Sequence, residues 1–396
     1  MPLRLHSARL VDATGERALA QIGIDGATII SVDASAPENW PAIDLSGAIV
    51  TPGFVDVHTH GGGGFSHNTG DSEEILAYAR WAATTGTTAF LIGVVGAPGG
   101  IPEAQLRAAV EAIERGGPGA EATGIHLEGP YINPARRGAH APAWLRTPSL
   151  AEADQLLELA RGHLSLITIA PELPGAPAMI RRLREAGVTI SIGHTDATYE
   201  QARDAIPLGI THATHCFNAM RPLHHREPGA LGAIVEADEV RGELIADNVH
   251  VHPAAARILI RALGPQRTIV VTDALACAGY AEGSSFTFAG QPARVIDGVA
   301  RLEDGTITGS ALTMDQALRN IVRYTGVSLH EAVGMLSLNP ARSAGIADRK
   351  GMLRPGYDAD LLIFDGDLHL QATICRGRLV FASESWRERL MMVPSA

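Results

Sequence analysis

Eight short apolar runs alternate with helix-like segments through most of this chain. The runs are rich in Val, Ile and Leu: GFVDVHTH, TTAFLIGVV, ATGIHLEG, LSLITIAPE, VTISIGHT, ITHATHCFN, GELIADNVH and TIVVTDA. Six of the segments between and after them space apolar residues three and four apart, as amphipathic helices do: EEILAYARWAAT, EAQLRAAVEAIERG, SLAEADQLLELARG, PAMIRRLREAG, YEQARDAIPLG and PAAARILIRALG. Strands this apolar indicate a parallel sheet covered by helices, and eight repeats favour a closed (β/α)8 barrel.

The two ends of the chain have a different, β-rich pattern. Residues 1–50 and 351–396 contain short alternating runs punctuated by Gly and Asp. We expect these ends to pair in one small β-sandwich domain. The barrel then spans residues 51–350, with a β insertion near residues 284–305. The predicted fold is α/β, a TIM-like barrel with a small domain built from both chain ends.

Composition narrows the class of partner. The 396 residues are 46% hydrophobic and 19% charged and hold no apolar run of membrane-spanning length, so we expect a cytoplasmic globular protein without a membrane partner. The three cysteines lack C-x-x-C spacing, which argues against a disulfide framework or a thiolate metal site. A net charge of −11 argues against nucleic acid as a partner. A small anionic substrate needs only one local cluster of Arg, His and backbone N–H groups.

Histidines and carboxylates fall at the ends of the apolar runs. Because the C-terminal ends of barrel strands meet at one rim, where the active sites of such barrels lie, these side chains should converge in space. Imidazole and carboxylate suit Zn²⁺ and similar ions, and three or four such ligands leave a coordination position open for water. The residues are His58, His60, Glu128, His194, His215, His250 and Asp273.

Two further polar residues in these runs are less informative. In THATH, His212 and His215 lie three apart, so on one strand they face opposite ways. We choose His215 for the site and expect His212 to pack against the surrounding helices. Glu172, after the fourth run, is explained equally well by a structural role and is left out of the predicted site.

The same residues lie in motifs that resemble those of the N-acetylglucosamine-6-phosphate deacetylases of the amidohydrolase superfamily. The resemblance runs from about Thr51 to the GYDADL segment. Its specific part is HLEGP, FNAM with REPG downstream, and GSALTM in this order, whereas H-x-H and NPAR are shared by many amidohydrolases. The matching stretches are PGFVDVHTHG, GIHLEGPYINPARRGAH, GHTDATYEQA, THCFNAM, IADNVHVHP, VTDA and TGSALTMDQALRN.

The resemblance implies a role for each matched residue. Glu128, His194 and His215 are the expected metal ligands, and Asp273 is the expected catalytic acid and base. Family members differ at the H-x-H motif of the first run, so the presence of His58 and His60 leaves open whether one or two ions bind. Zn²⁺ is expected, with Fe²⁺ or Mn²⁺ as alternatives. The implied substrate contacts are Ala139, His140, Asn218, Ala219, Arg226, Asp247, His250, Ile307, Thr308 and Gly309.

The implied reaction is hydrolysis of N-acetyl-D-glucosamine 6-phosphate to D-glucosamine 6-phosphate and acetate, in amino-sugar catabolism. In the family, the Arg and His that match Arg226 and His250 hold the phosphate, and the Arg reaches across a dimer interface. A homodimer is therefore expected. GAPGG follows the second run where the family is expected to carry a P-T pair, so another N-acetyl hexosamine 6-phosphate stays open as the substrate.

Two other classes of function compete with this interpretation. A dihydroorotase-like or N-acyl amino acid hydrolase normally carries a carboxylated lysine between two metals, and the eight apolar runs contain no Lys. A non-catalytic barrel module predicts loss of the ligand positions. Glu128, His194, His215 and Asp273 are instead all present, which favours catalysis.

Overall fold

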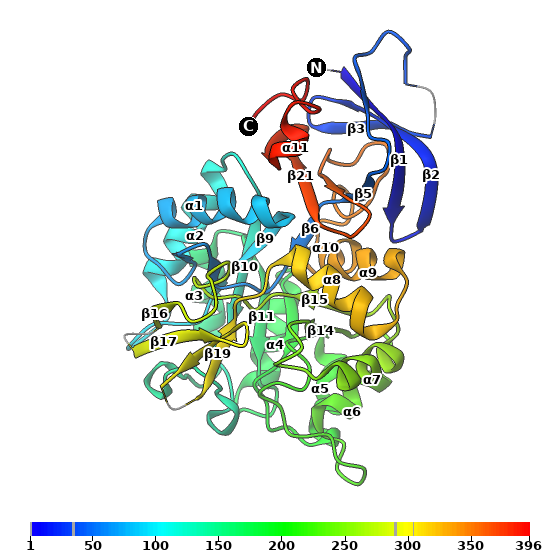
Figure 1. Cartoon of the computed structure of the whole chain (residues 1–396). Coiled ribbons are helices and arrows are strands. Elements are labelled where there is room, and N and C mark those ends of the chain that lie inside the picture. Colours follow the sequence, from blue (N-terminus) through cyan, green and yellow to red (C-terminus); the bar gives the residue numbers. More distant parts are fainter. Residues whose placement is uncertain (1, 34–35, 289–290, 304) are drawn as a thin grey trace.

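A closed barrel of eight parallel strands forms the centre of the molecule (Figure 1). The structure, a computed structural model, describes residues 2–33, 36–288, 291–303 and 305–396. The barrel strands are β6 (Phe54–Asp56), β9 (Thr87–Val94), β10 (Glu121–Glu128), β11 (Leu164–Ile169), β12 (Thr189–Ile192), β13 (Ile210–Ala213), β14 (Arg241–Ile245) and β15 (Thr268–Val271).

The strands pair in the order in which they occur in the chain, from β6 to β15. Just beyond the ends of β6 and β15, the chain closes the ring: the Asp273 N–H donates to the His58 carbonyl and the His60 N–H to the Ala274 carbonyl, both at 2.8 Å. The predicted (β/α)8 barrel is thus confirmed, and its eight strands are the eight apolar runs.

Helices cover the outside of the barrel. The six predicted segments form α1 (Ser72–Ala82), α2 (Glu103–Arg115), α3 (Leu150–Ala160), α4 (Ala176–Glu185), α5 (Tyr199–Ala205) and α7 (Pro253–Leu263). Outside those segments lie α6 (Gly229–Glu236), α8 (Met314–Thr325), α9 (Leu329–Leu336) and α10 (Leu338–Ser343). Short 3-10 turns span Ala83–Thr85, Pro134–Arg136, Pro142–Trp144 and Ile206–Leu208.

Local sequence explains how α5 begins and how α4 packs. Thr198 and Gln201 form a reciprocal capping box at the start of α5, which satisfies backbone N–H groups that have no partner within the helix. On α4, Met179, Ile180 and Leu183 are buried on one face. Among the described residues, no helix is both long and apolar enough to cross a lipid bilayer.

The two ends of the chain meet in a separate β-rich domain, as predicted (Figure 1). β5 joins the two halves, because it pairs in parallel with β1 and antiparallel with β20. A hydrophobic cluster of this domain draws on both ends, including Leu3, Leu361 and Ile374. The strands are β1 (Pro2–Asp12), β2 (Gly15–Asp25), β3 (Thr28–Val32), β4 (Ala42–Asp44), β5 (Ile49–Pro52), β20 (Leu361–Phe364), β21 (Leu370–Cys375) and β22 (Arg378–Ala382), followed by α11 (Glu384–Arg387).

A small antiparallel sheet lies between β15 and α8 in the chain and borders the C-terminal rim. The Ser310 N–H donates to the Asp273 carbonyl at 3.0 Å, and the Leu275 N–H donates back to the Ser310 carbonyl at 3.1 Å. This pairing holds the last strand of the sheet against the segment that follows β15. The strands are β16 (Ser285–Phe288), β17 (Gln291–Ile296), β18 (Val299–Leu302) and β19 (Ile307–Ser310), and a two-stranded ribbon, β7 (Gly61–Gly62) and β8 (Phe65–Ser66), follows the first barrel strand.

Candidate active site

Three ligand-type side chains from three strands converge at the C-terminal rim. Glu128 ends β10, His194 follows β12 and His215 follows β13. The Nε2 atoms of His194 and His215 each lie 3.0 Å from Glu128 Oε1 and 3.0 Å from one another. All three side chains are buried. The structure therefore brings the three predicted main ligands within reach of a single ion.

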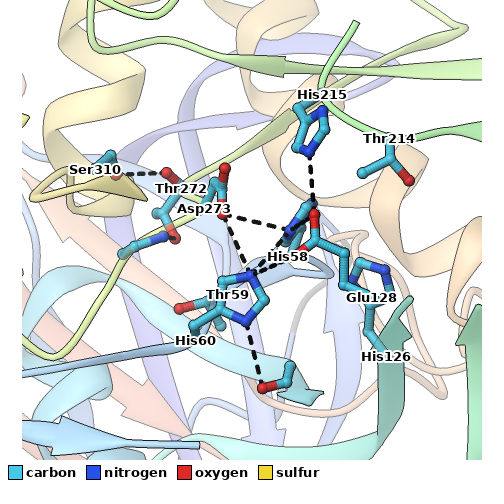
Figure 2. Close-up of polar contacts among 12 residues, drawn as sticks. His58, Thr59, His60, His126, Glu128, Thr214, His215, Thr272, Asp273 and Ser310 are labelled. Carbon is cyan, nitrogen blue, oxygen red and sulfur yellow. Dashed lines mark hydrogen bonds and ion pairs between the residues drawn. The ribbon is translucent and has the colours of Figure 1, made fainter. Parts of the chain in front are cut away.

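A second group lies beside the first and shares Glu128 with it (Figure 2). The Nε2 atoms of His58 and His60 are 3.2 Å apart, and each lies 3.4 Å from Asp273 Oδ1. Glu128 approaches both histidines, with Oε1 3.5 Å from His58 Nε2 and Oε2 3.1 Å from His60 Nε2. The arrangement has the form of two neighbouring cation positions joined by one carboxylate.

The outer ring nitrogens of His58 and His194 face hydrogen-bond acceptors. Nδ1 of His58 lies 2.7 Å from Glu243 Oε2, and Nδ1 of His194 lies 2.7 Å from the Arg136 carbonyl. With the proton on Nδ1, a neutral imidazole directs its Nε2 lone pair at the carboxylates of the cluster. Lone pairs facing one another at about 3 Å need a proton or a cation between them, and this donor set fits a divalent ion.

The buried carboxylates of the cluster favour positive charge on or between the neighbouring histidines. Burial disfavours a charged His58, but Glu243, Asp273 and Glu128 together raise its pKa well above the usual value. Burial acts the same way on His60, whose pKa nevertheless rises to about 9 because Asp273 and Glu128 accept hydrogen bonds from it. Either protons or a divalent cation can supply this positive charge, and the two compete for the same histidine nitrogen atoms.

The backbone turns sharply at three of these residues. His194, His215 and Asp273 have φ values of 47°, 26° and 47°, in or near the left-handed region that side chains with a Cβ rarely adopt. Each follows closely on the end of a barrel strand, and such conformations cluster at functional sites, where the surrounding structure enforces them. Gly193 is required beside His194, since a Cβ there would lie 2.6 Å from Thr214 Cβ.

A cavity of about 480 Å³ opens over the cluster. Its lining includes His60, Glu128, His194, His215 and Asp273. Most of the residues expected to contact substrate also line it: Ala139, His140, Asn218, Ala219, His250, Ile307, Thr308 and Gly309. The prediction omitted Ser66, Asn68, Trp144 and Phe286, which line the same cavity.

Asp247 and Arg226 do not line this cavity, although both were expected to contact substrate. The Asp247 carboxylate lies 2.5 Å from His250 Nδ1 and accepts the backbone N–H of His250 at 2.8 Å, so it holds that imidazole in place. Burial lowers the pKa of His250, but the hydrogen bond to Asp247 and the negative charges of Asp247 and Asp273 together outweigh burial and raise that pKa. Arg226 lies in an exposed loop, with Nη1 2.8 Å from His225 Nε2.

Glu243 is absent from the predicted site, yet it contacts two predicted ligands. It is fully buried on β14 and accepts hydrogen bonds from His58 Nδ1, His212 Nε2 and the His215 N–H. The sequence could have indicated this role, since Glu243 is a charged residue inside an apolar run, and a buried carboxylate needs hydrogen-bond or ion-pair partners.

His212 stays outside the ligand cluster, as expected, but it does more than pack against helices. Its Nε2 lies 2.8 Å from Glu243 Oε1, and its Nδ1 lies 3.0 Å from Ser343 Oγ of α10.

Glu172 accepts hydrogen bonds from Asn133 Nδ2, Thr195 Oγ1 and the Asp196 N–H, so its carboxylate links three loop segments near the rim.

Comparisons with known proteins agree with this geometry. Residues 49–383 match the model of the amidohydrolase family. N-acetylglucosamine-6-phosphate deacetylase of Bacillus subtilis is 35% identical over 92% of this chain and 93% of its own length. N-acetylgalactosamine-6-phosphate deacetylase of Escherichia coli O157:H7 is 36% identical over 95% of this chain and 98% of its own length. A mutant N-acetyl-D-glucosamine-6-phosphate deacetylase of Mycobacterium smegmatis has been solved with N-acetyl-D-glucosamine-6-phosphate. It superposes with a TM-score of 0.89 at 36% identity and covers 96% of this chain and 99% of its own.

Proposed function

The chain belongs to the amidohydrolase family, and we propose that it is a metal-dependent deacetylase that hydrolyses N-acetyl-D-glucosamine 6-phosphate to D-glucosamine 6-phosphate and acetate. One observation carries this proposal: Glu128, His194 and His215 meet at hydrogen-bonding distances beside Asp273, at the base of a cavity of about 480 Å³. Such a volume suits a small polar ligand. The reaction belongs to amino-sugar catabolism.

The metal-binding residues divide into two groups. Glu128, His194 and His215 would hold the main ion, and His58, His60 and Asp273, together with Glu128, would hold a second one. When bound, a divalent ion polarises the acetyl carbonyl and makes water a stronger nucleophile near neutral pH. Zn²⁺ is the proposed ion because it accepts mixed imidazole and carboxylate ligands; Fe²⁺ and Mn²⁺ are the alternatives.

Asp273 is the proposed acid and base. Two backbone hydrogen bonds, to the His58 carbonyl and from the Ser310 N–H, hold it at the edge of the cavity. Burial raises the pKa of its carboxyl, but the charge of His58 and the hydrogen bond from His60 together outweigh burial and keep that pKa below the usual value. The ionised carboxylate can therefore accept a proton from the attacking water. It then returns the proton to the sugar nitrogen, since an amide expels its amine poorly until that nitrogen is protonated.

Recognition of the phosphate requires a second copy of the chain in this proposal. None of the described residues that line the cavity is Lys or Arg, so in this proposal a permanently charged partner for the phosphate comes from another chain. Arg226, on its exposed loop, would reach the cavity of a partner in a homodimer. His250, whose Nδ1 is held by Asp247, would present its Nε2 to the same phosphate.

One set of assays tests the function. The purified enzyme is analysed for bound metal, and acetate release is followed with the 6-phosphates of N-acetylglucosamine, N-acetylgalactosamine and N-acetylmannosamine and with free N-acetylglucosamine. We expect the highest kcat/KM with N-acetylglucosamine 6-phosphate and a large loss without the phosphate. N-acetylgalactosamine 6-phosphate is the second candidate substrate, because the Escherichia coli relative named for it is 36% identical. A preference for this sugar would change the proposed substrate but not the proposed reaction. Equal rates with and without phosphate would remove the roles of Arg226 and His250.

A further inference from the structure

Glu243 is a buried carboxylate that the proposed reaction does not use directly. It lies on β14 with no exposed surface. Leaving such a group unpaired would be costly, because burial removes the water that otherwise stabilises its charge. Each of its oxygens has a partner, which indicates that this position is built for a carboxylate.

Two of the three partners of Glu243 belong to the proposed metal groups, one to each group. Oε2 accepts a hydrogen bond from His58 Nδ1 at 2.7 Å and from the His215 N–H at 2.9 Å. Oε1 lies 2.8 Å from Nε2 of His212. One carboxylate thus contacts the ring of a ligand in the second group and the backbone of a ligand in the main group.

The contact network continues from His212 into α10. Nδ1 of His212 lies 3.0 Å from Ser343 Oγ, the residue directly after the NPAR motif. Asn339 of that motif donates to the carbonyls of Pro265 and Thr268 at 2.8 Å, which ties α10 to the start of β15. Ser343, at the end of α10, therefore contacts the side of His212 that faces away from Glu243.

We propose that Glu243 is a positioning residue that makes His58 a metal ligand and so allows the second ion to bind. By accepting the Nδ1 proton of His58, Glu243 forces the Nε2 lone pair toward the position shared with His60 and Asp273. Its negative charge also offsets part of the charge of the ion. His212, which contacts Ser343 on its other side, holds Glu243 in the orientation that this requires. The inference rests on the proposed metal-dependent function, but its test does not depend on turnover.

Two substitutions separate the charge of Glu243 from its shape. Glu243→Gln keeps an oxygen that can accept the His58 proton but removes the charge, and Glu243→Ala removes both. Glu121→Gln is the matched control, because it makes the same chemical change at the opposite end of a barrel strand, away from the cluster. Circular dichroism and thermal unfolding establish that each variant folds.

Metal affinity is the decisive measurement. Bound metal is counted after dialysis, and affinities for Zn²⁺ and Co²⁺ are measured by competition with a chelator and from the visible spectrum of the cobalt form. We expect two ions per wild-type chain. In Glu243→Ala one ion should bind about 10- to 100-fold more weakly, and Glu243→Gln should show a smaller loss in the same direction. Glu121→Gln should retain both affinities.

A double-mutant comparison tests whether Glu243 acts through His58. If it does, adding Glu243→Gln to His58→Asn should cause little further loss of metal affinity, whereas independent effects would add. Wild-type affinities for both ions in Glu243→Gln would overturn the proposal, even if Glu243→Ala fails to fold. A wild-type chain that takes up only one ion would also overturn it. Two ions without deacetylation would instead contradict the proposed function alone.

Discussion

Asp273 combines two tasks in one side chain, since its carboxylate borders both the cavity and the second metal group. We predict that Asp273→Asn keeps substrate affinity and the ion held by Glu128, His194 and His215, because none of those contacts uses Asp273. Turnover should fall by about 10²- to 10⁴-fold, the usual contribution of a general acid and base. Steady-state kinetics and metal analysis check both parts, and near-normal kcat would contradict the assignment.

Gly193 tests how tightly the barrel interior holds His194. A Cβ at this position would lie 2.6 Å from Thr214 Cβ and 2.8 Å from Thr168 Cγ2. Gly193→Ala should therefore destabilise the fold by about 1–3 kcal/mol, as overpacking does, and weaken the main ion site by shifting His194. Denaturant unfolding and metal titration measure the two effects. Gly366→Ala serves as control, because a Cβ there meets nothing within 4 Å.

At the level of the elements, the barrel could be predicted because its strands are apolar on both faces. The same feature predicts the rim residues, since chain segments that end at one rim bring their last side chains together. α6 escaped prediction because GALGAIVE begins with glycine, has no side-chain cap and lacks a polar face. Such a run has none of the sequence features that mark the start and the exposed side of a helix.

Glu243 shows the limit of prediction within the site. Its nearest partner, His58, is 185 residues away in the chain, so no local spacing connects them. The argument that His212 and His215 face opposite ways because they lie three apart on one strand has a related limit. β13 ends at Ala213, before His215 is reached, so strand alternation does not decide where His215 points.

The loop that carries Arg226 leads to a prediction about assembly. Arg226→Ala should raise KM for the phosphorylated sugar and leave kcat/KM for the unphosphorylated sugar unchanged, because only the phosphate contact is lost. If Arg226 acts in the partner's site, mixing Arg226→Ala with inactive Asp273→Asn chains should restore activity. Random exchange would give roughly a quarter of wild-type activity, since half of the dimers are mixed and each holds one intact site. No recovery after verified exchange would place Arg226 outside the partner's site.

On the scale of the whole molecule, an ion-pair cluster joins the barrel to the segment that leads into the small domain. Glu121, at the start of β10, lies 2.6 Å from Arg349 and 3.0 Å from Lys350, and Lys350 also lies 2.6 Å from Asp360. The Lys350 side chain is only 1% exposed. Its charge is therefore almost wholly removed from water and depends on these carboxylates, so breaking one pair should be costly.

Acid should weaken this junction in a defined pH range. Burial raises the pKa of Glu121, but the hydrogen bond from Arg349 and the charge of Lys350 outweigh burial and lower that pKa from 4.5 to about 2. A lowered pKa in the folded state means that Glu121 stabilises the fold above about pH 4.5 and that this contribution disappears as the pH falls toward 2. The loss should be at most roughly 3 kcal/mol. Urea unfolding between pH 7 and 2 measures it. Glu121→Gln should be less stable at pH 7 and should lose less stability on acidification than the wild type; parallel losses in the two proteins would show that Glu121 is not the group that titrates.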